Sequence, residues 1–112
     1  MDIVAESVCG VSPHVPSCRA NLCLGYAYQA LLATQWRTQG MHIGLARAHS
    51  VRISGELMQH TDLRAYPQLH YTIIMERLDI TNSIYQHPEW SAEQAHDTVW
   101  LWCHARWDPA NP

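Results

Sequence analysis

The sequence predicts an all-α protein, a small bundle of about four helices preceded by an irregular N-terminal arm. Apolar side chains recur at intervals of three and four residues over long stretches, which places them on one face of a helix. Residues that favour helix starts and helix stops bound these stretches. A length of 112 residues suits a single domain. We assign residues 1–17 to the arm and residues 18–112 to one helical domain.

The arm is rich in residues that oppose regular structure, including a glycine and two prolines, and we expect it to be partly disordered. The first helix is predicted to begin after Ser17, a good N-cap residue, and to end near Gln39, with Gly40 as the stop. Its middle, residues 22–33, is apolar nearly all round. Such a helix must be buried on more than one side, so we expect it to be central or shared with another chain.

The second helix is predicted over residues 41–60. Small residues recur along one of its faces, and they are Gly44, Ala48, Val51, Gly55 and Met58. The first helix is also rich in small residues, so the pattern predicts a close antiparallel hairpin of the two helices. Residues 51–55 also suit a short strand, and both interpretations stay open.

The third helix is predicted to begin near Pro67, since proline is favoured in the first turn. One apolar stripe runs along it, formed by Leu69, Ile73, Ile80 and Ile84. The β-branched residues 72–74 leave a strand over residues 69–75 open as an alternative. The length of the pattern, about five turns, favours a helix.

The fourth helix is predicted from Ala92 to about Trp107, because Ser91 and Gln94 have the spacing of a capping box. One stripe, formed by Ala95, Val99 and Trp102, is assigned to the core. A second stripe lies beside it, formed by His96, Trp100, Cys103 and Trp107. We assign Trp102 to the core and Trp100 to a partner-facing side. Tryptophans crowd this region of the chain, Trp90 included.

The charge pattern argues against binding to nucleic acid or to a membrane surface. The net charge is −3, and the seven basic residues are all arginines scattered singly along the chain. Binding to phosphates or to anionic lipid needs a basic stripe or patch, which the sequence does not have. Lysine and phenylalanine are both absent, which fits an association surface or, more simply, the codon bias of a GC-rich bacterial or phage genome.

The sequence favours a cytoplasmic protein. Its first residues carry acids where a signal peptide needs bases, and the apolar run Leu22–Ala33 is far shorter than the ~20 residues of a membrane helix. The four cysteines are therefore predicted to be free thiols. Cys9, His14, Cys18 and Cys23 have the number but not the spacing of a zinc site, so we expect no metal or other cofactor. No catalytic motif appears, and we expect no enzyme activity.

The low charged fraction of 15% leaves apolar surface for a partner. The leading hypothesis is a small regulatory binding protein that docks an apolar, aromatic helix face onto a larger protein, as a modulator or inhibitor of a bacterial regulator or effector complex. The candidate contacts are Leu24, Tyr28, Leu31, Leu32, Trp100 and Trp107. The alternatives are a metal- or thiol-sensing module built on the N-terminal cysteine and histidine set, and a structural homodimer subunit.

Overall fold

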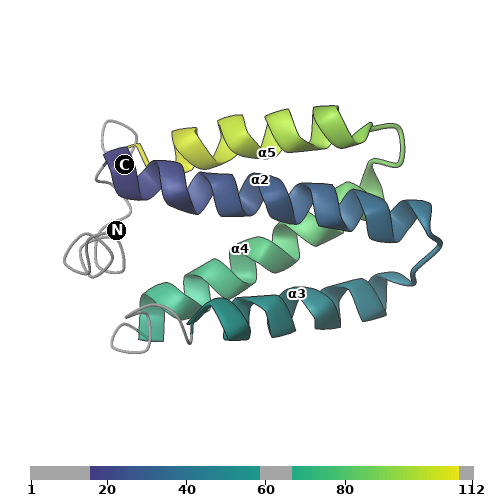
Figure 1. The fold of residues 1–112 in the computed structure, drawn as a ribbon, viewed down its shortest axis with the longest axis horizontal. Helices are drawn as coiled ribbons and strands as arrows, with labels where there is room; N and C mark the ends of the chain where they lie inside the picture. Colours follow the sequence, from purple (N-terminus) through teal and green to yellow (C-terminus); the bar gives the residue numbers. More distant parts are fainter. Residues whose placement is uncertain (1–15, 59–66, 109–112) are drawn as a thin grey trace.

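The computed structural model describes residues 16–58 and 67–108, which form four helices (Figure 1). These are α2 (Pro16–Thr38), α3 (Ile43–Met58), α4 (Pro67–Gln86) and α5 (Ala92–Arg106). The all-α prediction is confirmed, and residues 51–55 and 69–75 are helical rather than extended. The predicted arm lies almost wholly outside the described residues.

Local signals set the helix ends where the sequence predicts them. Gly40 has a φ of +80°, a conformation that favours glycine, and it follows the end of α2. The N–H of Met41 donates to the carbonyl of Trp36 and the N–H of Gly40 donates to that of Arg37, which is the Schellman pattern. At the start of α5, the Ser91 side chain accepts a hydrogen bond from the Gln94 N–H. The Gln94 side chain accepts one from the Ser91 N–H, so the predicted capping box is confirmed.

Successive helices run in opposite directions, and α2 lies at the centre of the bundle (Figure 1). It packs against both α5 and α4, while α3 packs mainly against α4. The central position predicted for the first helix is therefore confirmed. The core is formed from these packed faces by Cys23, Tyr26, Ala30, Ala33, Ile73, Ile80, Ile84, Ala95, Val99, Cys103 and Trp107.

The predicted close hairpin of the first two helices is wrong, because α3 touches α2 only slightly. Gly44, Ala48 and Val51, from the row of small residues, are exposed. The buried side of α3 instead carries Ala46, Ser50 and Ser54, which are equally small. Ser50 turns inward because its hydroxyl bonds Gln29 and Thr81 there, an advantage that an apolar pattern does not reveal. The hydroxyl of Ser54 is satisfied within α3, by the carbonyl of Ser50.

A buried polar network joins three helices at the middle of the bundle. The amide of Gln29 on α2 donates to Ser50 Oγ at 2.9 Å and to Thr81 Oγ1 at 3.2 Å. Arg77 donates to the Gln29 carbonyl oxygen at 3.0 Å and lies over the Tyr26 ring. Burial lowers the pKa of Arg77, but a guanidinium still remains charged at neutral pH. Because these partners come from α2, α3 and α4, the network specifies how the three helices pack.

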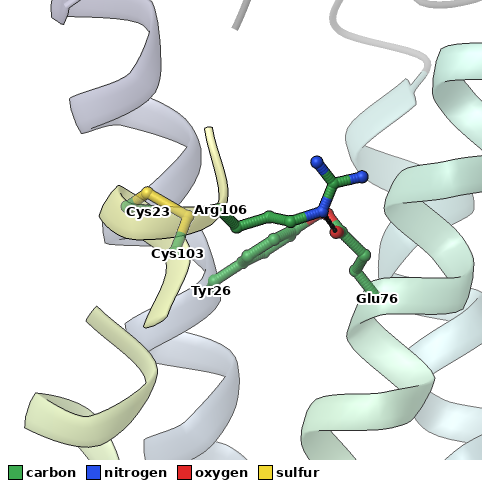
Figure 2. The surroundings of a disulfide bond; sticks show 5 residues. All are labelled: Cys23, Tyr26, Glu76, Cys103 and Arg106. Carbon is green, nitrogen blue, oxygen red and sulfur yellow. Dashed lines mark hydrogen bonds and ion pairs between the residues drawn. A yellow bond between two sulfur atoms is a disulfide. The ribbon is translucent and has the colours of Figure 1, made fainter. Parts of the chain in front are cut away.

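A disulfide between Cys23 and Cys103 joins α2 to α5, so the prediction of free thiols is wrong (Figure 2). Both side chains are fully buried, and the Cα atoms lie 5.5 Å apart. Cys18 is also disulfide-bonded, and no cysteine within the described ranges is free. The cysteines of the first pair are 80 residues apart in the sequence, so only the packing of α2 against α5 brings them together.

Arg37 fastens the end of α2 to the turn between α4 and α5. Its Nη1 donates to the carbonyls of Ile84 at 2.7 Å and His87 at 2.9 Å, and its Nη2 donates to that of Trp90 at 2.7 Å. The carbonyls at the end of a helix have no partner within the helix, and a cation is favoured there by the helix dipole. Arg37 therefore acts as a C-terminal cap for α4 supplied by another helix.

We expect the Arg37→Met variant to lose about 3 kcal/mol of unfolding free energy, because three carbonyls lose a charged donor. Urea denaturation followed by circular dichroism measures the loss. Arg47→Met is the matched control, since Arg47 is exposed and makes one hydrogen bond, to Asn82. A control variant that loses as much stability as Arg37→Met would contradict this role.

Candidate binding surface

The candidate contacts on the first helix lie on the side of α2 that faces away from the core. Leu24 and Tyr28, one helical turn apart, are each 60% exposed. Leu31 and Leu32 are half-buried. We call these four residues the outer face of α2. The apolar residues of this helix therefore lie on two sides: one side fills the core, and the other presents apolar side chains to solvent.

The assignment of the tryptophans on α5 needs correction. Trp102, predicted in the core, is 41% exposed, whereas Trp107, predicted to contact a partner, is only 6% exposed. Trp100 is half-buried and packs against the core. The buried side of α5 follows a four-residue spacing, through Ala95, Val99, Cys103 and Trp107. The disulfide at Cys103 holds the buried side of α5 against α2. Because Trp102 precedes Cys103 by one residue, its side chain points away from that side and lies next to the core, not within it.

Two of the four residues of the alternative metal or thiol sensor, Cys9, His14, Cys18 and Cys23, are disulfide-bonded in the structure. Zinc binds the thiolate form of cysteine, and Cys18 and Cys23 are both in disulfides. Cys9 and His14 lie outside the described residues. Within residues 16–58 and 67–108, no three His, Cys, Asp or Glu side chains come together as a metal site.

Three charged or polar groups meet beside the disulfide. Figure 2 shows Tyr26 on α2 and Arg106 on α5 pointing toward the carboxylate of Glu76 on α4. Tyr26 Oη donates to Glu76 Oε1 at 2.8 Å, and Arg106 Nε lies 3.3 Å from Glu76 Oε2. Burial raises the pKa of Tyr26, and the adjacent carboxylate raises it further, so the phenol keeps its proton. Each oxygen of Glu76 has a partner, which makes this cluster a means of joining three helices.

A groove with a volume of about 370 Å³ runs between α4 and α5. Both helices pack on α2 more than on each other, which leaves the space between them open. Asp79, Ile80 and Ser83 line it from α4, and Thr98, Val99 and Trp102 line it from α5, with Trp90 from the turn. Ile80 and Val99 are buried, whereas Asp79, Thr98 and Trp102 are exposed.

The sequence analysis did not find this groove. The crowding of tryptophans was a usable signal, since Trp90 and Trp102 both contribute to it. Asp79 gave no signal, because an isolated acid on a helix is ordinarily part of a solvated face. Only the packing of α4 and α5 on α2 brings Asp79 and Trp102 to the same groove.

No family model, no curated protein and no solved structure gives a significant match to the chain. The function is therefore inferred from the fold and the surfaces described above. Among the described helices, none combines the length and the apolar character needed to span a membrane.

Proposed function

We propose that this chain is a small protein-binding module that docks the outer face of α2 onto a larger protein and so modulates it. The observation that carries the proposal is the exposure of Leu24 and Tyr28 on one turn of a central helix. Tyrosine is enriched among the residues that dominate binding energy at interfaces. An apolar helix face that enters a hydrophobic groove is a recurrent mode of recognition.

The remainder of the fold supports this role because it holds α2 rigidly. A disulfide joins α2 to α5, the Gln29 network joins it to α3 and α4, and Arg37 joins its end to the α4–α5 turn. A helix held in this way loses little conformational entropy on binding, so more of the contact energy appears as affinity. The second candidate is a homodimer in which the outer faces of two copies of α2 meet, which the same surface would allow.

We also propose that the chain works in an oxidising compartment, in place of the cytoplasm expected from the sequence. The support is chemical: Cys23 and Cys103 form a buried disulfide and Cys18 is in another. Glutathione and thioredoxin keep most cytosolic thiols reduced, so structural disulfides are typical of secreted, periplasmic or lumenal proteins.

Site-specific photo-crosslinking in the native host tests the proposed face. A photoreactive benzoyl-phenylalanine placed at Tyr28 should give one discrete adduct, either with a larger protein or with a second copy of this chain. The same group at Leu45, an exposed residue on α3, is the control and should give no such adduct. Equal labelling from both positions, or none from Tyr28, would count against the proposal.

Light scattering tests whether the partner is a second copy. If the wild type is a dimer, replacing Leu24 and Tyr28 with glutamate should return it to the monomer mass, because two charges would be buried at the interface. The matched control replaces Leu45 and Val51, two exposed apolar residues of α3, with glutamate. This control should leave the mass unchanged, and both double variants should keep the helical content of the wild type.

A further inference from the structure

The α4–α5 groove combines an apolar floor with aromatic walls. Ile80 and Val99 are buried at its base, and Trp102 is 41% exposed along its side. The Trp102 ring stacks on that of Tyr26, with the ring centroids 6.2 Å apart, and Trp102 also lines the groove. The groove thus offers an aromatic surface that the fold itself leaves accessible.

A carboxylate also lines this groove. Asp79 is exposed and lines the same groove. Within residues 16–58 and 67–108, no hydrogen bond or ion pair engages its oxygens. The faces of aromatic rings attract cations because of the ring quadrupole, and an adjacent carboxylate adds to that attraction. The lining of the groove is therefore complementary to a positive charge on an apolar stem.

One arginine of the chain, Arg106, is held elsewhere by the same combination of groups. The Arg106 guanidinium lies 4.6 Å from the centroid of the Trp107 ring and pairs with the Glu76 carboxylate at 3.3 Å. Arg77 lies 5.5 Å from the centroid of the Tyr26 ring, and its polar partner is the amide oxygen of Gln29. The Arg106 contact shows that an aromatic ring with a carboxylate beside it holds a guanidinium in this fold.

We propose that the α4–α5 groove binds an arginine side chain presented by a segment of a partner protein. The guanidinium lies against Trp102 and donates to Asp79, and flanking apolar side chains of the segment contact Ile80 and Val99. Arginine suits the site better than lysine because its planar group stacks on a ring and donates to a carboxylate at the same time. A protein segment suits it better than a small molecule because the groove is partly open to solvent, whereas small-molecule sites enclose most of their ligand.

This site is separate from the outer face of α2, since none of its lining residues belongs to that helix. Each of the two proposals can therefore be disproved without affecting the other. Crosslinking from Tyr28 reports on the outer face of α2, and peptide binding reports on the groove.

Titration of the ¹⁵N-labelled full chain with the probe peptide acetyl-Leu-Arg-Leu-amide, followed by NMR, tests the proposal. We expect saturable shifts centred on Asp79 and on the indole N–H of Trp90 and Trp102. The same peptide with citrulline in place of arginine has the same shape without the charge, and we expect it to bind about tenfold more weakly. Equal binding of the two peptides, or shifts outside the groove, would overturn the proposal.

Two variants and a third probe complete the test. Asp79→Asn should weaken arginine-peptide binding about threefold to fivefold, while Glu93→Gln, at an exposed acid of α5 outside the groove, should leave it unchanged. An equal loss in both variants would overturn the role of Asp79. Benzyltrimethylammonium is the small-molecule probe, and binding as tight as that of the peptide would show that the site takes free organic cations instead. The comparison of arginine with citrulline uses the wild type, so it holds whether or not a variant folds.

Discussion

Replacing Cys23 and Cys103 together with alanine is expected to lower the free energy of unfolding by about 4 kcal/mol. The disulfide closes a loop of 80 residues, and a loop of that length removes about this much free energy from the unfolded chain. It also joins α2 to α5 within the core, so its loss leaves that contact to side-chain packing alone. The melting temperature should fall by on the order of 20 °C, measured by circular dichroism.

A reduced wild type separates the effect of the bond from the effect of the substitutions. Its side chains remain in place, but reduction also opens the disulfide of Cys18. A Cys18→Ala variant, compared before and after reduction, therefore assigns a loss of similar size to the Cys23–Cys103 bond and not to a cavity. Thiol alkylation followed by intact mass measurement establishes the starting state. Reactive thiols at Cys23 and Cys103 in the native protein, together with no loss of stability on reduction, would contradict both the disulfide and the oxidising compartment.

Trp107→Ala is expected to cost about 3–5 kcal/mol of stability, the usual range for a buried aromatic residue. Trp107 is 6% exposed and packs into the core at the end of α5. Trp102→Ala should cost only about 1 kcal/mol, because Trp102 is 41% exposed and loses mainly its stacking with Tyr26. Denaturant melts of the two variants measure both values.

This pair of variants tests the orientation of α5 about its own axis, since the two substitutions are chemically identical. The order of the two losses depends only on which tryptophan faces the core. A folded Trp107→Ala protein with wild-type stability, beside a strongly destabilised Trp102→Ala protein, would mean that α5 is rotated. The α4–α5 groove would then lose its aromatic wall.

The sequence determined the helices because the signals that begin and end them are local. Gly40 ends α2 through a backbone conformation that glycine adopts readily, and Ser91 with Gln94 begins α5 within one turn. The apolar stripe of α4 was also recoverable, since Ile73, Ile80 and Ile84 are all buried. Each of these features depends on residues within a few positions of one another, and the chain encodes them without reference to the rest of the fold.

Tertiary structure alone decided how the helices face one another. Ser50 and Thr81 are buried because Gln29 from another helix bonds both, and Glu76 is buried because Tyr26 and Arg106 reach its two oxygens. Burying such groups is costly without partners, so a pattern of apolar residues assigns them to the surface. The pairing of Cys23 with Cys103 across 80 residues, the inward side of α5 and the groove beside Asp79 all follow from the packing of α4 and α5 on α2. Contacts between distant segments depend on that packing, and the periodicity within a single helix carries no information about it.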